Sequence, residues 1–302
     1  MRSVAVIIPC LNEESTIGKV VADFRAQLPA AGIYVVDNNS TDATAAMACE
    51  AGASVIHEQQ PGKGYAVRKA FRTVEADVYV MVDGDDTYPA DRVTALIEPV
   101  LSDAADIVVG SRLMGGTGGF RRRNRLGNKF FRWSINTLFK TGLTDVLSGY
   151  RAMSRSFVKR MQILARGFEI EAEMTVMALN RGFRIVEIPA ELRSRPEDSE
   201  SKISVVGDGL KILGEIFSLY CYYKPLSFFG GTGLLLLLLA LLSLLTGVPD
   251  PSSLTARILH PCLAIVGILS IAVGGILHVT TRRFQELDQR LDLLNDEISR
   301  SG

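Results

Sequence analysis

The sequence predicts an α/β domain with a mostly parallel sheet, followed by a two-helix transmembrane hairpin. Strand-like and helix-like patterns alternate along residues 1–203, which favours a parallel sheet with helices on both faces. Polar clusters follow the predicted strands, at the position where sheets of this kind bind ligands. Two stretches near the C-terminal end, 226–246 and 258–279, contain no Asp, Glu, Lys or Arg.

The elements of the domain follow from short apolar runs and from apolar residues at helical spacing. The runs predict strands at 4–8, 34–36, 54–56, 78–82 and 107–109. The spacing between them predicts helices at about 13–28, 41–51, 65–74 and 92–101. Ser40 or Thr41 is suited to cap the second helix, because a hydroxyl can accept a hydrogen bond from a free N–H.

Each apolar stretch is long enough to cross a bilayer, which takes about 20 helical residues. The alternative is that both stretches are fully buried core helices of a soluble protein. A lone hairpin, however, would have no core large enough to cover both helices. Within the second stretch Ser270 and Gly274 are spaced for close helix contact. Basic residues flank the hairpin (225–280) at Lys211, Lys224, Arg282 and Arg283. The positive-inside rule therefore predicts two spans, with the catalytic part and both termini cytoplasmic. We expect no signal peptide, because a strand pattern begins almost at once.

The segments beside the hairpin also show helical patterns. Residues 204–224 predict an amphipathic helix at the membrane interface, and a helix packed on the domain is the alternative. Residues 281–302 predict a cytoplasmic amphipathic tail, suited to self-association into a homo-oligomer. Its apolar stripe consists of Phe284, Leu287, Leu291, Leu294 and Ile298.

Composition excludes several classes of protein. The 33 basic and 33 acidic residues cancel, which argues against a nucleic-acid binder. Apolar residues make up 47% of the chain and charged residues 22%, so the chain is not disordered. The 4 cysteines form no CxxC pair and the 3 histidines lie far apart, which argues against a disulfide framework or a zinc site.

Asp83 and Asp85 form the most informative cluster, because only Gly84 separates two carboxylates that leave an apolar strand. Such carboxylates repel one another unless a cation lies between them, and their hard oxygens favour Mg²⁺ or Mn²⁺. A divalent ion there would bridge a diphosphate and neutralise a departing nucleotide. A chance surface loop is the alternative, and the position at a strand end argues against it.

Other strand-end residues are candidates for nucleotide contacts. Asp37 could accept hydrogen bonds from a base or ribose, with a helix-capping role as the alternative. Glu13 could reach a nucleotide or favour the N-terminus of the helix that follows. Lys63 lies between two glycines in PGKGYA, a loop that could approach phosphates but lacks P-loop spacing.

The sequence carries IIPCLNEE, VVDNNSTDAT, GKGYAVRKA, VMVDGDDTYP, VVGSR and LSGYRAMSR in this order. Together these motifs resemble glycosyltransferase family 2, over residues 3 to about 203. With the hairpin, the chain is most similar to polyprenyl-phosphate glycosyltransferases of the dolichyl-phosphate mannose synthase type. The resemblance implies a Rossmann-like GT-A fold. It also implies inverting transfer of a sugar from a UDP- or GDP-sugar to the phosphate of a polyprenyl or dolichyl phosphate in the bilayer.

The resemblance implies roles for individual residues. Those expected to bind the donor are Pro9, Glu13, Asp37, Lys63, Asp83 and Ser148. Asp83 and Asp85 would bind the metal. Those expected to take part in catalysis are Asp85, Arg112, Asp145 and Arg151, with Arg112 approaching the phosphates. Thr87 stands where many synthases have a glutamine that completes the metal site, so water or donor oxygens would fill the shell.

Basic segments are the candidates for the lipid phosphate. A loop that follows the glycine-rich 115–120 carries Arg121, Arg122, Arg123 and Arg125, whose guanidinium forks suit a phosphate. A solvated loop attracted to anionic lipid heads is the alternative. The resemblance implies a second basic segment with Arg193, Arg195, Ser201 and Lys202. It also places a helix with Glu169, Glu171 and Glu173 under the acceptor, and a solvated helix face is the alternative.

A lipid phosphate needs little deprotonation, because its second pKa lies near 6. We therefore expect positioning and charge neutralisation to do most of the work, with Asp145 a weak candidate for an obligatory base. One alternative is a family 2 transferase that acts on a sugar hydroxyl in polysaccharide or glycolipid synthesis, although the sequence lacks the QxxRW of processive synthases. Another is a non-catalytic nucleotide-sugar sensor. A separate flippase is an expected partner, and the sugar and base stay open.

Overall fold

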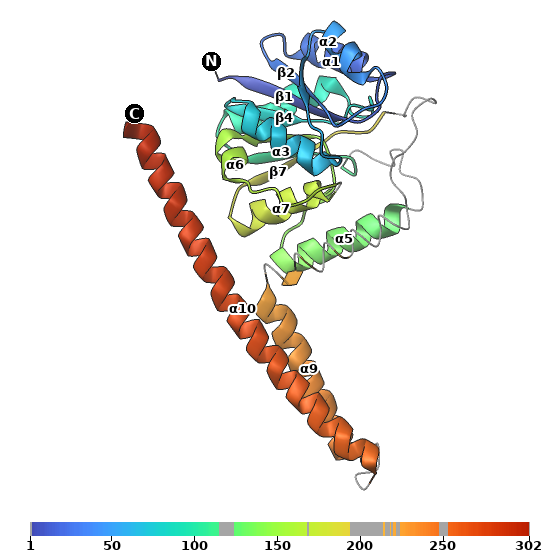
Figure 1. Cartoon of the computed structure of the whole chain (residues 1–302), viewed down its shortest axis with the longest axis vertical. Helices are drawn as coiled ribbons and strands as arrows, with labels where there is room; N and C mark the ends of the chain where they lie inside the picture. Colours follow the sequence, from blue (N-terminus) through green and yellow to red (C-terminus); the bar gives the residue numbers. More distant parts are fainter. Residues whose placement is uncertain are drawn as a thin grey trace. The chain divides into compact units, whose positions relative to one another are not determined.

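The computed structural model describes residues 2–114, 124–167, 169–193, 224–247 and 253–301, together with 214, 218, 220 and 221. The chain divides into two compact units, Met1–Leu213 and Gly214–Gly302 (Figure 1). The first unit contains the sheet, and the second contains the two long apolar helices.

The sheet of the first unit has seven strands among the described residues, in the order β3-β2-β1-β4-β6-β5-β7. They are β1 (Val4–Cys10), β2 (Gly32–Asp37), β3 (Ser54–His57), β4 (Val78–Met81), β5 (Ile107–Ser111), β6 (Arg151–Ser154) and β7 (Ile185–Pro189). Only β6 runs antiparallel to its neighbours β4 and β5. The other neighbouring strands pair in parallel, which confirms the predicted mostly parallel sheet.

Helices cover both faces of this sheet, because successive side chains of a strand point to opposite faces. Val6 and Ile8 of β1 pack in the core under α1 (Ile17–Gln27), α2 (Thr44–Glu50) and α4 (Val93–Leu101). Ala5 and Ile7 pack in the opposite core under α3 (Lys63–Thr73), α6 (Arg155–Arg160) and α7 (Ile170–Asn180). The helix α5 (Asn124–Phe139) buries Phe131 and Ile135, and a short 3-10 turn (Ala90–Arg92) precedes α4.

The prediction that Ser40 or Thr41 caps the second helix was wrong, because α2 begins only at Thr44. The Ser40 hydroxyl accepts the amide of Asn12 at 2.9 Å, and the Thr41 amide donates to the Asn12 side chain at 2.8 Å. The loop after β1 and the loop after β2 therefore brace each other. The first helix likewise begins at Ile17, because residues 13–16 form a turn in which the Glu13 carbonyl accepts the amides of Thr16 and Ile17.

The second unit consists of α9 (Pro225–Thr246) and α10 (Leu254–Ser301), which pack side by side (Figure 1). Their backbones approach closely at Gly233 and Gly267, where an added Cβ would lie 2.5 Å and 2.9 Å from the carbonyl oxygen of the other glycine. The Ser270 hydroxyl donates to the Phe229 carbonyl at 2.8 Å, and a Cβ on Gly274 would lie 2.9 Å from the Phe229 Cβ. The contact predicted for Ser270 and Gly274 is therefore confirmed.

Both helices are long and apolar enough to cross a membrane. Only 11% of each apolar window is buried, so these are not the covered core helices of the alternative interpretation. The tail predicted at 281–302 is not a separate helix, because α10 continues from the second span to Ser301. Most of the predicted interfacial segment 204–224 lies outside the described residues, and the orientation of the termini stays a prediction.

Candidate active site

The candidate site lies at the edge of the sheet where β1, β2, β4 and β5 end. Strand β1 pairs with β2 on one side and with β4 on the other, so the strand order changes direction at β1. In open α/β sheets ligands bind outside the carboxyl ends of the strands at such a point. The predicted donor residues Glu13, Asp37 and Asp83 and the predicted metal ligand Asp85 all follow or end these strands. Half-buried Pro9 lies within β1.

Asp37 ends β2 as a buried carboxylate with local partners. One oxygen accepts the Ser40 amide at 3.2 Å, and the other lies 3.2 Å from the His57 Nδ1. Its neighbour Asn38 was not predicted, yet its side chain accepts the Gly62 amide at 2.7 Å and donates to the carbonyl oxygens of residues 58 and 60. Asn38 therefore fixes the loop that leads to Lys63.

The loop after β4 carries the two predicted metal ligands in a tightly packed place. Asp85 is 7% exposed, and its Oδ1 accepts the Thr87 hydroxyl at 2.6 Å and the Thr87 amide at 3.2 Å. A Cβ on Gly84 would lie 2.5 Å from the Cys10 Sγ. A Cβ on Gly149 would lie 2.6 Å from Asp83 Oδ2. Since neither position has room for a side chain, glycines allow the approach of this loop to β1 and to the loop before β6.

Lys63 lies against Asp83 in the described structure. Its ammonium nitrogen is 2.5 Å from Asp83 Oδ1 and 2.5 Å from an oxygen of Glu171, which belongs to α7. Burial of the ammonium group opposes its charge, but the two carboxylates outweigh this effect and raise the pKa of Lys63. We call Lys63, Asp83, Asp85 and Glu171 the Asp83 cluster. It holds three carboxylates and one ammonium group, a formal charge of 1 − 3 = −2 before the neighbouring guanidinium groups of Arg112, which interacts with Asp83, and Arg151, which interacts with Glu171, are counted.

The α7 carboxylates are not on a solvated helix face, so that alternative interpretation was wrong. Glu171 is 4% exposed and Glu173 is 8% exposed. Glu173 accepts the amides of Leu164 and Ala165, both at 2.9 Å, and Glu169 accepts those of Arg166 and Gly167. Glu173 and Glu169 therefore fix the loop before α7, and Glu171 is the member that reaches Lys63.

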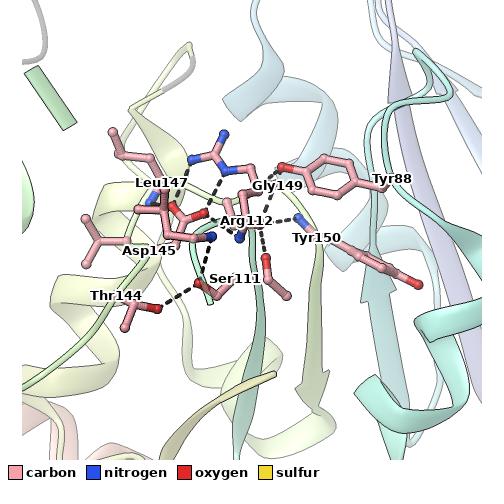
Figure 2. A network of polar contacts seen from close by, with 12 residues as sticks. Tyr88, Ser111, Arg112, Thr144, Asp145, Leu147, Gly149 and Tyr150 are labelled. Atoms are coloured by element: carbon pink, nitrogen blue, oxygen red, sulfur yellow. Dashed lines mark hydrogen bonds and ion pairs between the residues drawn. The ribbon is translucent and has the colours of Figure 1, made fainter. Parts of the chain in front are cut away.

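Arg112 and Asp145 form a two-pronged ion pair beyond the end of β5 (Figure 2). Nε and Nη2 of Arg112 lie 2.7 Å and 2.8 Å from the two carboxylate oxygens, and the Arg112 amide donates at 3.0 Å. Burial opposes ionisation of the carboxyl, but the Arg112 contacts outweigh it and hold the pKa of Asp145 below its ordinary value. Asp145 is therefore an ionised partner of Arg112.

Glu187 on β7 holds the same loop from the other side. Its carboxylate accepts the amides of Thr144 and Asp145 at 2.7 Å and 2.8 Å. We call Arg112, Asp145 and Glu187 the Asp145 cluster, with a net charge of 1 − 2 = −1. The sequence signal for Glu187 is its place in IVEIP, a charged residue inside an otherwise apolar strand.

The predicted residues Ser148 and Arg151 are both completely buried. The Ser148 hydroxyl donates to the Gly110 carbonyl at 2.6 Å, and the Tyr88 hydroxyl accepts the Gly149 amide at 3.0 Å (Figure 2). Arg151 donates to the carbonyls of Ser148 and Val146 at 2.8 Å and 2.9 Å, and burial lowers the pKa of its guanidinium to about 10. In this conformation both residues shape the loop before β6, and their roles in donor binding and catalysis stay predictions.

Of the predicted acceptor residues, the side chain of Arg193 alone is described. Its amide donates to the Thr87 carbonyl at 2.8 Å, and its guanidinium lies 3.4 Å from Asp23 and 3.7 Å from Asp86. Arg121, Arg122, Arg123, Arg195, Ser201 and Lys202, and the side chain of Arg125, lie outside the described residues.

The family model "Glycosyl transferase family 2" matches residues 5–161 of this chain. Glycosyltransferase AglJ of Haloferax volcanii is 34% identical over 233 residues, which cover 76% of each chain. The chain belongs to glycosyltransferase family 2.

One further relative and one solved structure are similar to this chain. A dolichyl-phosphate hexose transferase of Haloferax volcanii is 30% identical over 208 residues, 69% of this chain and 90% of that one. Glucosyl-3-phosphoglycerate synthase from Mycobacterium tuberculosis, in complex with Mn²⁺ and UDP-glucose, has a similar fold with a TM-score of 0.59 and 23% identity. That similarity covers 72% of this chain and 79% of the other, and it confirms the predicted GT-A fold.

The predicted metal ligands Asp83 and Asp85 both belong to the Asp83 cluster. Within the described part of the chain no group of three or more His, Cys, Asp or Glu side chains is arranged to hold a metal. Asp83 and Asp85 nevertheless supply hard oxygen ligands on one loop at the carboxyl end of β4. This donor set fits Mg²⁺ or Mn²⁺ in chemistry, with phosphate and water oxygens needed to complete a shell.

Proposed function

We propose that this glycosyltransferase moves a sugar, with inversion, from a UDP- or GDP-sugar to the phosphate of a polyprenyl or dolichyl phosphate. The observation that carries the proposal is the pair of apolar helices, 11% buried, on the chain of a family 2 glycosyltransferase. An enzyme anchored to a bilayer in this way encounters a lipid acceptor by diffusion within the plane of the membrane. The similarity to a dolichyl-phosphate hexose transferase supports the same acceptor class.

The donor would bind at the Asp83 cluster. Asp83 and Asp85 would hold Mg²⁺ or Mn²⁺, and the ion would neutralise charge on the diphosphate when bound. The Mn²⁺ complex of the Mycobacterium tuberculosis synthase supports this choice of metal. Lys63 holds Asp83 and Glu171 together, so it keeps one carboxylate oriented toward the donor edge. Asp37 and Glu13, on the neighbouring loops, would contact the nucleoside.

The lipid phosphate would attack without a dedicated protein base. A phosphate monoester is largely dianionic at pH 7, because its second pKa lies near 6. Asp145 is ill suited to remove a proton, since Arg112 contacts both of its oxygens and keeps its pKa low. Arg112, held in place by Asp145, would approach the phosphates of the donor. These residues therefore contribute charge and position, the terms that dominate transfer between phosphorylated groups.

The acceptor phosphate would be drawn by the basic segments. Arg121, Arg122, Arg123 and Arg125 follow a glycine-rich stretch, and Arg195, Ser201 and Lys202 precede the apolar helices in sequence. Guanidinium groups bind phosphate with two parallel hydrogen bonds. Both spans would cross the membrane with the catalytic unit and both termini in the cytoplasm.

A reconstituted transfer assay tests the proposed function. The full chain in liposomes is given UDP-glucose, UDP-N-acetylglucosamine or GDP-mannose, each with Mn²⁺, Mg²⁺ or a chelator. The acceptors are undecaprenyl phosphate, dolichyl phosphate and, as the matched control, undecaprenol without its phosphate. We expect labelled lipid only with a phosphorylated acceptor and a divalent ion. Transfer to a sugar hydroxyl, with none to either lipid phosphate for any donor, would reject the proposal.

A further inference from the structure

Thr87 connects the loop after β4 with the stretch of chain that follows β7. Its hydroxyl donates to Asp85 Oδ1 at 2.6 Å, and its carbonyl accepts the Arg193 amide at 2.8 Å. One residue therefore binds a candidate metal ligand on one side and the last described residue before 194–213 on the other. Family resemblance gives no role to this threonine, since many synthases carry glutamine at its position.

Side chains reinforce this connection around Asp86. The Arg193 guanidinium lies 3.7 Å from Asp86 and 3.4 Å from Asp23, while Lys19 lies 2.8 Å from Asp86. Asp86 has a left-handed backbone with φ of 55°, a conformation that aspartate adopts more readily than most other residues with a side chain. Residues 85–87 are thus held from the side of β7 and from α1 at once.

We propose that Thr87 is a positioning residue for the metal ligand Asp85, and that Arg193 holds Thr87 and Asp86 in the required conformation. A carboxylate that accepts a hydroxyl hydrogen bond keeps a fixed orientation, and such outer partners tune metal binding. The inference rests on the proposed use of Asp85 as a metal ligand.

This assignment differs from the predicted role of Arg193 at the lipid phosphate. An arginine that faces two aspartates already has its charge compensated, which makes it a poorer phosphate ligand than an arginine without acidic neighbours. Arg193 would therefore act through the loop at the donor edge, and loss of its side chain should affect the metal and the donor before the acceptor.

The test measures Mn²⁺ binding to the full chain in detergent, from the electron paramagnetic resonance signal of free Mn²⁺. Thr87→Val removes the hydroxyl and keeps the shape of the side chain, whereas Thr87→Ser keeps the hydroxyl. We expect Thr87→Val to raise the Mn²⁺ dissociation constant by about 10- to 100-fold, the usual effect of losing an outer partner of a metal ligand. Thr87→Ser should remain close to wild type, and the melting temperatures of both variants report their folding.

Arg193→Gln tests the second half of the inference, with Arg184→Gln as its matched control. Arg184 is also an exposed arginine paired with an aspartate, Asp106, but it lies at the amino ends of β5 and β7. We expect Arg193→Gln to weaken Mn²⁺ binding and to raise the donor KM more than the lipid KM, and Arg184→Gln to do neither.

Each result supports or overturns a stated part of the inference. Mn²⁺ binding by Thr87→Val that equals wild type overturns the role of Thr87, and a larger rise of the lipid KM in Arg193→Gln overturns that of Arg193. A wild-type chain that binds no Mn²⁺ overturns the inference as a whole. Failure of the proposed lipid acceptor is seen separately, in the product of the transfer assay, and leaves these binding results unchanged.

Discussion

The Asp83 cluster and the Asp145 cluster lie at the same edge of one sheet and use the same chemical groups differently. In the Asp83 cluster one ammonium group faces carboxylates from two elements, and Asp85 on the same loop is held by Thr87. In the Asp145 cluster Arg112 contacts both oxygens of Asp145, and backbone amides satisfy Glu187. The comparison shows that the first cluster has more carboxylates than ammonium groups and contains the predicted metal ligands, while in the second each carboxylate is bound by Arg112 or by backbone amides.

Replacement of Asp85 should give the largest effect, because it removes a hard ligand from the cluster that contains the predicted metal ligands. We expect Asp85→Asn to lower kcat/KM by about 10²- to 10³-fold, the scale of losing one preorganised electrostatic group. Steady-state transfer to the lipid acceptor measures this. Asp103→Asn is the matched control, since Asp103 is an exposed carboxylate paired with Arg2. Equal losses of activity in Asp85→Asn and Asp103→Asn would show that the effect is not specific to the Asp83 cluster.

Removal of the Lys63 ammonium should destabilise the protein, because it leaves the buried Glu171 carboxylate without its cation and facing the partly exposed Asp83 carboxylate. Breaking a buried ion pair from one side costs about 3–5 kcal/mol. We therefore expect Lys63→Met to have a much lower melting temperature than wild type. Added Mn²⁺ should raise that temperature more in the variant than in wild type, since the ion replaces the missing charge.

The exposed Lys19→Met is the control for the Lys63 variant. Lys19 contacts Asp23 and Asp86 but belongs to neither cluster. A Lys63→Met protein that gains no stability from Mn²⁺ would contradict the view that a cation suits this place.

The pH dependence of the stability of Asp145→Asn gives a second test of the comparison between the two clusters. Because the folded pKa of Asp145 is lowered, its contribution to stability is present above the unfolded pKa of about 3.9 and is lost as pH falls through the lower folded value. The stability difference between wild type and Asp145→Asn should thus be full at pH 7 and shrink in acid. Unfolding by denaturant at several pH values measures it.

The same variant tests whether Asp145 is a base. We expect the activity of Asp145→Asn to be lower than that of wild type by the same factor at every pH from 6 to 9. The reason is that the acceptor phosphate is already ionised and needs no protein base to remove a proton. A loss as large as that of Asp85→Asn, restored by raising the pH, would show that Asp145 removes a proton.

Glu187→Gln should give the smallest effect of the four. The amide keeps one acceptor oxygen for the Thr144 or Asp145 amide, but the other backbone N–H loses its partner. An unsatisfied buried donor costs about 1–3 kcal/mol, so we expect a modest loss of stability. The donor KM should change little, and a loss of activity without loss of stability would place Glu187 in direct contact with a substrate.

Much of the fold could be predicted because the local pattern of apolar residues agrees with the secondary structure that these segments form. The Val- and Ile-rich runs become β1 to β5, and Asp83 and Asp85 follow a strand as predicted. The strands β6 and β7 were not predicted: β6 has only the short run RAMS, and a Glu interrupts β7.

The partners of the site residues were harder to predict, since they come from distant parts of the chain. Lys63 and Glu171 are separated by 108 residues, so no short-range sequence pattern could predict that their side chains are in contact. Asp145 and Glu187 are 42 residues apart, on a loop and a strand that contact each other directly in the folded chain. Sequence therefore identifies the charged groups, while the charge balance of each cluster needs the structure.

The central claim, that the Asp83 cluster and not the Asp145 cluster takes the cation, is tested most directly by anomalous X-ray scattering. Crystals of the full chain with Mn²⁺ and a nucleoside diphosphate would be measured at the manganese absorption edge. We predict a peak in coordination range of Asp83 and Asp85, and none at Arg112 and Asp145. A peak beside Asp145, or an ordered diphosphate at the sheet edge without manganese at Asp83 and Asp85, would contradict the account.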